Sequence, residues 1–140
     1  MRRRHGAGRL VVNVDGGARG NPGPAAIATV ISTDKGEVLE EHGERIGTAT
    51  NNVAEYRALL HGLERAHSLG ASEVELIGDS ELVVRQVRGE YKVKDEALKK
   101  LYAQVVKALA ELDRWSIRHV PREHNEAADR LVNEVLDADS

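Results

Sequence analysis

The feature that most constrains the fold is the order of apolar patterns along the chain. Two apolar, β-branched runs, at residues 10–15 and 25–32, and a third, more polar strand pattern at residues 37–46 follow one another before residue 50. Beyond that point, helical spacing alternates with strand-like runs. Consecutive short strands favour an antiparallel meander, whereas strand-helix alternation favours parallel strands joined by right-handed crossovers. The sequence therefore predicts one mixed sheet.

The second part of the chain supplies four helical patterns and two strands. Apolar residues recur at helical spacing, and Ser80 and Asn125 are typical helix caps, while Gly70 and Gly89 are natural helix ends. We expect helices at residues 52–69, 80–87, 95–112 and 125–136, and strands at residues 74–79 and 115–120. The predicted fold is α/β: a five-stranded mixed sheet, three antiparallel strands then parallel strands, with helices on both faces.

Length and composition fit a single folded domain. The chain has 140 residues, of which 41% are hydrophobic and 31% charged. We assign residues 9–137 to the domain, residues 1–8 to a basic flexible N-terminal arm and residues 138–140 to a C-terminal tail. Because there is no cysteine, disulfides, thiolate zinc sites and cysteine nucleophiles are excluded. With no apolar run typical of a signal peptide or membrane span, we expect a cytoplasmic monomer without membrane contact.

One segment is locally basic although the net charge is −3. Residues 85–107 contain seven Lys or Arg (85, 88, 92, 94, 99, 100, 107) and three acids (90, 95, 96), an excess of four. A solvated helical face explains this excess as well as a nucleic-acid patch does. The charge pattern alone therefore favours the simpler interpretation.

Four acidic side chains stand out by their position in the predicted elements. Asp15 and Asp79 each end a strand, so their carboxylates can be neighbours at one edge of the sheet. Glu55 shares the apolar stripe of its helix, which turns it toward the sheet. Asp129 lies in the first turns of the last helix, beside that helix's apolar stripe. All four can converge.

Such a cluster has a definite chemistry. Carboxylates without cationic partners repel one another unless divalent cations neutralise them. Oxygen ligands favour Mg²⁺, with Mn²⁺ as a substitute, over zinc. Two such ions about 3.5–4 Å apart support in-line attack at phosphorus. The predicted reaction is phosphodiester hydrolysis.

Each acid also has a purely structural explanation. Glu55 lies at capping-box spacing from Asn52, and Asp129 suits a helix N-terminus. Asp79 fits a strand-to-helix turn, and Asp15 could hold the glycine-rich loop by hydrogen bonds. Singly, these explanations are preferable; the coincidence of four acids favours a site.

Four sequence blocks carry a resemblance to a known family. They read VDGGARGNPG at residues 14–23, TNNVAEYRAL at 50–59, GDS at 78–80 and NEAAD at 125–129. Over residues 10–136 the chain resembles ribonuclease H type 1, in the bacterial and archaeal subgroup that lacks a basic protrusion. The family's four metal-binding acids fall on Asp15, Glu55, Asp79 and Asp129.

The resemblance implies cleavage of the RNA strand of RNA–DNA hybrids with two Mg²⁺ ions, independent of sequence, leaving 5′-phosphate and 3′-hydroxyl ends. It places Asn21, Asn51 and Asn52 in the minor groove of the hybrid, where short amides can detect 2′-hydroxyls, and Thr50 near a DNA phosphate. We also expect substrate contacts from Gly16, Gly17 and Ser80.

The resemblance leaves open which side chain assists proton transfer or product release. Many relatives use a mobile histidine near the last acid, and His119 has the matching distance from Asp129. Because His119 alternates with apolar residues of the last strand, a packed structural histidine is an alternative. The charged loop at residues 120–125 offers Arg122 as a phosphate or product contact and His124 for proton transfer.

The predicted surface for binding the hybrid is smaller than in larger relatives. Residues 89–94 are all that stands for the basic protrusion of larger relatives, so tight hybrid binding is not expected. Lys92 and Lys94, with Lys99 and Lys100, are candidates for phosphate contacts.

Three alternatives remain. A related-fold nuclease would act on double-stranded RNA or branched DNA, and a non-catalytic module would bind hybrids only. A nucleotide-binding loop at residues 16–23 is disfavoured because the loop lacks Gly-Lys-Ser/Thr and leads into a strand. His42, His61 and His67 show no ligand spacing along the chain, so zinc hydrolysis is not predicted.

Overall fold

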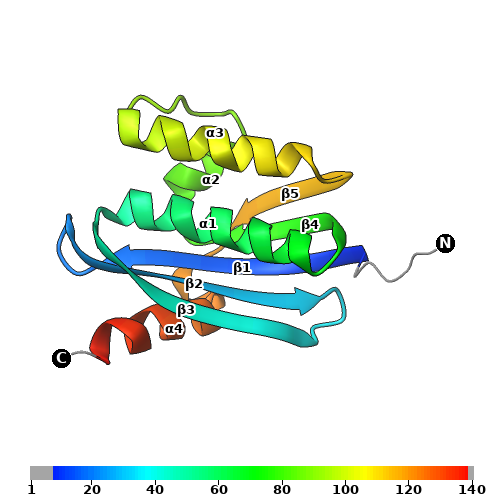
Figure 1. The fold of residues 1–140 in the computed structure, drawn as a ribbon, viewed down its shortest axis with the longest axis horizontal. Coiled ribbons are helices and arrows are strands. Elements are labelled where there is room, and N and C mark those ends of the chain that lie inside the picture. Colours follow the sequence, from blue (N-terminus) through cyan, green and yellow to red (C-terminus); the bar gives the residue numbers. More distant parts are fainter. Residues whose placement is uncertain (1–7, 139–140) are drawn as a thin grey trace.

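The computed structural model describes residues 8–138, which form a five-stranded mixed sheet with helices on both faces (Figure 1). The strands are β1 (Gly8–Ala18), β2 (Gly23–Thr33), β3 (Val38–Ala49), β4 (Ala71–Gly78) and β5 (Arg114–His119). The helices are α1 (Asn51–Ser68), α2 (Glu81–Val87), α3 (Glu96–Ala110) and α4 (Glu126–Asp137), with a 3₁₀ turn η1 (Arg122–His124) before α4.

The strand order is β3-β2-β1-β4-β5. β1 and β3 are antiparallel to β2, and β4 is parallel to both β1 and β5. The predicted architecture is therefore confirmed. The predicted arm at residues 1–8 lies outside the described residues except for Gly8, which begins β1. Of the predicted tail, only Ala138 is described.

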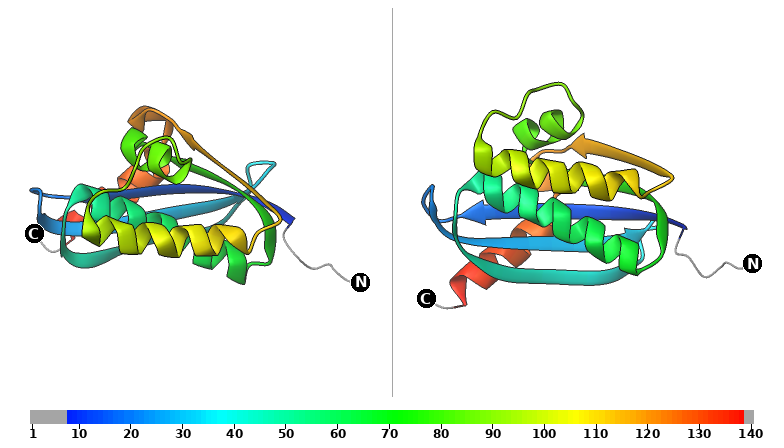
Figure 2. Two further views of the ribbon diagram at one scale, coloured as in Figure 1. Left: turned by 90° about the horizontal axis from the view of Figure 1, so that it is seen from above. Right: turned by 45° about the horizontal axis from the view of Figure 1, so that its top comes forward.

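The sheet separates two apolar cores. Helices α1 and α3 lie side by side over one face, and α4 crosses the other (Figure 2). Strand β2 serves both, because alternate residues point to opposite faces. Its Ile27 and Ile31 belong to the larger core, whereas Ala26, Ala28 and Val30 pack against α4. Two of these three side chains are alanines, so the core under α4 is the smaller of the two.

Strand β1 extends beyond its predicted end. Gly16 pairs with Ile27 and Ala18 with Ala25 in the antiparallel register of β1 and β2. Asp15 therefore lies within a strand rather than at its end, and only residues 19–22 form the hairpin loop. The prediction was wrong here because glycines were interpreted as loop formers.

Helix α1 packs unusually close to β1 at two glycines. A Cβ on Gly16 would lie 2.3 Å from the backbone of Ala54, and one on Gly62 would lie 2.7 Å from Val12 Cγ1. No larger residue fits without displacement. The helix starts at Thr50, whose Oγ1 accepts a hydrogen bond from Val53 N at 3.2 Å, so Asn52 is not the cap.

The basic segment is partly neutralised. Arg85 forms ion pairs with Glu81 and Glu90, and Lys99 with Glu96. Residues 88–95 form the short connection between α2 and α3. Within residues 8–138, no helix is long and apolar enough to cross a membrane.

Candidate active site

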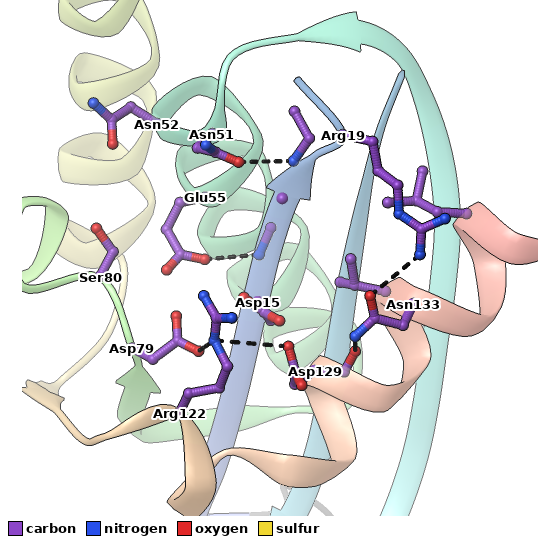
Figure 3. A pocket seen from close by; sticks show the side chains of 15 residues that line it. Asp15, Arg19, Asn51, Asn52, Glu55, Asp79, Ser80, Arg122, Asp129 and Asn133 are labelled. Carbon is purple, nitrogen blue, oxygen red and sulfur yellow. Dashed lines mark hydrogen bonds and ion pairs between the residues drawn. The ribbon is translucent and has the colours of Figure 1, made fainter. Parts of the chain in front are cut away.

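Four acids from four parts of the chain meet beside the sheet (Figure 3). Asp15 comes from β1, Glu55 from α1, Asp79 from the residue after β4, and Asp129 from α4. Oxygen atoms of the first three lie within 4.8 Å of one another. The predicted convergence is present, and the three closest carboxylates can hold a metal ion.

Strand register explains why two of these acids are neighbours. β1 and β4 are parallel, and Asn13 pairs with Ile77. Asp15 and Asp79 each follow two residues later, so both strands bring a carboxylate to the same level of the sheet. This part of the prediction follows from strand geometry alone.

Glu55 and Asp129 approach from opposite faces. Glu55 is 3% exposed, and its Oε1 accepts a hydrogen bond from Gly16 N at 2.8 Å. A Cβ on Gly78 would lie 3.7 Å from Glu55 Oε2. Gly16 leaves room for the backbone of α1 at Ala54 and Glu55, and this close approach brings the Glu55 carboxylate to β1.

The electrostatics of the cluster favour protonation or a bound cation. Burial, followed by the charges of Asp79 and Asp129, raises the pKa of Asp15 to about 7. Burial also raises the pKa of Glu55 well above its usual value, with Asp15 and Asp79 adding to the effect. Burial raises the pKa of Asp79, against the opposing charge of Arg122. The protein holds these acids together at an energetic cost.

A metal fits this arrangement. The buried Oδ2 of Asp79 has no hydrogen-bond partner among the described residues. Arg122 Nε lies 3.9 Å from that atom and 4.0 Å from Asp129 Oδ1, too far for a hydrogen bond. Its side chain is 75% exposed, so its charge is partly screened. The cluster is left short of positive charge.

The acids open into a cavity of about 370 Å³. Its lining contains most of the predicted site residues, namely Asp15, Gly16, Gly17, Asn51, Asn52, Glu55, Asp79, Ser80, Arg122 and Asp129. Asn21, Thr50, Lys92, Lys94 and His124 do not line it. The two lysines are exposed on the α2–α3 connection.

Asn21 instead supports the rim of the cavity, and Thr50 caps the start of α1. Asn21 Oδ1 accepts a hydrogen bond from Asn51 N at 3.0 Å, and Asn51 Oδ1 accepts one from Ala18 N at 2.8 Å. These bonds join the β1–β2 loop to the start of α1. Asn21 and Asn51 of the predicted asparagine group therefore form one connected unit rather than separate contacts.

Asn125 has a role that the sequence did not reveal. It was predicted to cap α4, but its side chain makes no capping hydrogen bond. Its Nδ2 donates to Val14 O at 2.8 Å, and its Oδ1 accepts from Asn13 Nδ2 at 3.0 Å. Asn125 thereby fixes the start of α4, and with it Asp129, to β1. A polar Asn13 within an apolar strand was the available signal.

The cavity lining also includes Arg19 and Asn133, which were not predicted. Arg19 forms an ion pair with Asp137 at 2.6 Å and donates to Asn133 Oδ1 at 3.4 Å. Arginine in a glycine-rich loop was the signal that could have identified this cationic side of the cavity.

Both candidate assisting histidines, His119 and His124, are exposed to solvent. His119 is exposed, so the alternative of a packed structural histidine is wrong. It ends β5, and its charge lowers the pKa of Asp79. His124 is exposed in η1, directly before the residues that lead into α4.

Comparison with known proteins agrees with this geometry. Residues 13–135 match the family described as reverse transcriptase-like. The chain is 48% identical to a bifunctional protein, Rv2228c of Mycobacterium tuberculosis, over 93% of its own length but 36% of that protein's length. It thus spans about a third of that relative.

Two crystal structures are similar over nearly their full length. RNase H1 from the archaeon Halobacterium salinarum has a TM-score of 0.90 and 45% identity, with 93% of this chain and 98% of that chain covered. LC11-RNase H1, solved in complex with an RNA/DNA hybrid, has a TM-score of 0.89 and 46% identity, covering 93% and 98%. The chain belongs to the reverse transcriptase-like family and, within it, to the type 1 ribonucleases H.

Proposed function

We propose that the protein is an endoribonuclease that hydrolyses the RNA strand of RNA–DNA hybrids independently of sequence. The observation that carries this proposal is the group of three carboxylates within 4.8 Å, buried or half-buried and short of positive charge. Such a group suits metal-assisted hydrolysis of a phosphodiester. The relative solved with a hybrid supports the choice of substrate.

The metal ligands in this proposal are Asp15, Glu55, Asp79 and Asp129, and the ions are Mg²⁺, with Mn²⁺ as a substitute. All donors are oxygen atoms, which suits these hard cations. When bound, two such ions would neutralise the carboxylates and supply positive charge at the reacting phosphate. The unpartnered Oδ2 of Asp79 supports this assignment.

The protein's own groups would hold the phosphate and move protons. In the reaction, a water oxygen bonds to phosphorus while the P–O3′ bond breaks, which leaves a 5′-phosphate and a 3′-hydroxyl. We assign Arg122 to the departing phosphate, because its guanidinium lies at the mouth of the acid cluster and is mostly exposed. His124 is the proposed proton-transfer group, and exposed His119 near Asp79 is the alternative.

Substrate recognition is assigned to the rim of the cavity. Gly16, Gly17 and Ser80, which line the cavity, are assigned to contacts with the duplex. Asn51 and Asn52 would reach the minor groove, where 2′-hydroxyls mark the RNA strand. The hydrogen bonds that join Asn21, Asn51 and Ala18 support this role for Asn51, because they hold the amides of Asn21 and Asn51 in fixed positions.

Phosphate contacts would extend beyond the cavity. Thr50 is assigned to the DNA strand, and Lys92 and Lys94 to phosphates farther along the duplex. The lysines are exposed, as such a role requires. Each lost contact would weaken the salt dependence of binding. The proposal also places the protein in the cytoplasm as a monomer. The absence of cysteine is consistent with that reducing compartment.

The test compares substrates and metals with one matched variant. Labelled RNA–DNA hybrid, double-stranded RNA and branched DNA are each incubated with Mg²⁺, with Mn²⁺ and with chelator. The proposal expects internal cuts in the RNA of the hybrid, dependent on metal and absent in Asp15→Asn, which keeps side-chain size but removes charge.

Each rival function has its own outcome. Preferential cleavage of double-stranded RNA or branched DNA would replace the proposed substrate. Binding of the hybrid without cleavage in either metal would identify a non-catalytic hybrid-binding module and overturn the proposal.

A further inference from the structure

A second group of potential metal ligands lies away from the acid cluster. It consists of His42 and Glu44 on β3 and His61 on α1, each with one ligand atom within 4.8 Å of the others. His42 Nε2 lies 2.8 Å from Glu44 Oε1. The rings of His42 and His61 are stacked, with centroids 4.4 Å apart. The fold brings together residues whose spacing in sequence gave no indication of a site.

Strand and helix geometry account for this meeting. His42 and Glu44 alternate with Gly43, so they share one face of β3. A Cβ on Gly43 would point at Val135 of α4, 3.0 Å from its Cγ2, which shows that residues 42 and 44 face the α1 side. His61 reaches them from α1, which packs over β2.

The surroundings of His61 suit a ligand. Its Nδ1 lies 3.5 Å from Oγ1 of Thr29, a fully buried residue on β2 that pairs with His42 across the sheet. A hydroxyl that accepts from Nδ1–H would leave Nε2 for a metal, as second-shell groups commonly do. Burial and then the charge of His42 lower the pKa of His61.

This group is separate from the proposed active site. His61 lies six residues after Glu55 on α1, about 9 Å along the helix axis. Glu44 and His61 line a cavity of about 200 Å³. None of the residues that line this cavity lines the one at the acid cluster.

We propose that His42, Glu44 and His61 form a second metal site, which takes a late first-row divalent cation such as Zn²⁺ rather than Mg²⁺. Two imidazoles and one carboxylate are a common zinc donor set that leaves a fourth position for water. Imidazole ligands select against Mg²⁺. The hydrogen bond between His42 and Glu44 would give way to two metal–ligand bonds.

The bound ion would join the edge strand β3 to α1. The neighbouring Glu40–Arg65 ion pair, with Nε and Oε2 2.7 Å apart, already makes one such connection on the same strand and helix. The site would therefore act as a second cross-link, and its occupancy can be measured by stability as well as by binding.

The test measures Zn²⁺ binding to the full chain by titration calorimetry, with millimolar Mg²⁺ present to occupy the acid cluster. We expect one equivalent of Zn²⁺. His61→Ala should weaken this binding at least about tenfold, since even loss of a second-shell group costs that much. His67→Ala, an exposed histidine on the same helix, is the matched control and should leave binding unchanged.

Glu44→Gln is a second variant, because it keeps the size of an exposed side chain and leaves the packing of α1 intact. It should also weaken binding and remove the rise in melting temperature that Zn²⁺ produces in the unaltered protein. Absence of Zn²⁺ binding would overturn the proposal. Binding lost in Asp15→Asn but kept in His61→Ala and Glu44→Gln would place the ion in the acid cluster and overturn it equally.

Discussion

Glu75 on β4 and Asp79 directly after it have opposite electrostatic environments. Glu75 accepts hydrogen bonds from Arg9 at 3.0 Å and Arg118 at 2.7 Å, and these partners lower its pKa, Arg118 most. Four residues later, Asp79 lies with Asp15 in a cluster where burial raises both pKa values. A carboxylate is thus a stabilising group at Glu75 and a strained one at Asp79, although both lie along β4 or directly after it.

The difference shows where the fold gives up stability. A carboxylate that serves only the structure receives cationic partners from the neighbouring strands, as Glu75 does from β1 and β5. The acid cluster has no cationic side chain of the described residues at hydrogen-bond distance. Its negative charge must therefore be neutralised by a bound cation. Functional sites commonly depart from local optimality in this way.

The largest expected effect is on activity, in Asp79→Asn. This variant keeps the volume of the side chain and removes the charge that the proposed metal requires. We expect hybrid cleavage to fall on the order of 10²–10³-fold, as when a group that stabilises developing charge is lost. Initial cleavage rates at saturating Mg²⁺ measure this, and Glu75→Gln, the matched change on β4, should retain the original rate. Equal losses in both variants would remove the distinction between the two environments.

The next effect is on stability as a function of pH, without metal. Because the pKa of Asp15 is raised from 3.8 to about 7, the folded state binds more protons than the unfolded state between these values. This contribution therefore lowers the free energy of unfolding as pH rises from about 4 to 7, by roughly 3 kcal/mol in total.

Asp15→Asn removes that contribution. In chelator, the variant should be more stable than the unaltered protein at pH 8, and the gap should close toward pH 4. Urea unfolding across this range measures it. A pH-independent gap would mean that Asp15 is not the titrating group. Added Mg²⁺ should restore stability to the unaltered protein more than to the variant.

A third effect concerns the support of the cluster. Asn125→Ala leaves Val14 O and the Asn13 side chain without their partner, and burial of such groups costs about 1–3 kcal/mol. Urea unfolding should show this loss. His124→Ala, an exposed neighbour in η1, should change the free energy of unfolding by less than about 0.5 kcal/mol.

The sequence predicted the elements and the four acids because both follow from periodicity. Strand alternation and helical spacing place Asp15, Glu55, Asp79 and Asp129 before any tertiary contact is known. Ser80 and Gly70 were identified as a cap and a stop, and both behave so: Ser80 Oγ accepts from Val83 N, and Gly70 has φ 86°.

What the sequence did not predict depends on contacts between distant segments. Asn125 forms its bonds with β1, which lies more than 100 residues earlier in the chain. His42 and His61 meet only because α1 packs over β2 and β3. Thr50, rather than Asn52, caps α1 because the helix begins earlier than its apolar pattern. Local periodicity contains none of this information.

The smallest predicted effect tests the paired side of the comparison. Glu75→Gln removes a charge held by two partly exposed arginines, so we expect a loss of about 0.5–1 kcal/mol in the free energy of unfolding at pH 7. Because partners lower the pKa of Glu75 from 4.5, its contribution is present above that value and is lost as pH falls through the folded-state pKa. The loss of unfolding free energy caused by Glu75→Gln should therefore disappear in acid. The gain caused by Asp15→Asn should disappear there too. At neutral pH the two variants should change the free energy of unfolding in opposite directions. If Glu75→Gln instead stabilised the protein at pH 7, the ion pairs of Glu75 would be as unfavourable as the acid cluster. The presence of cationic partners would then no longer distinguish the two environments.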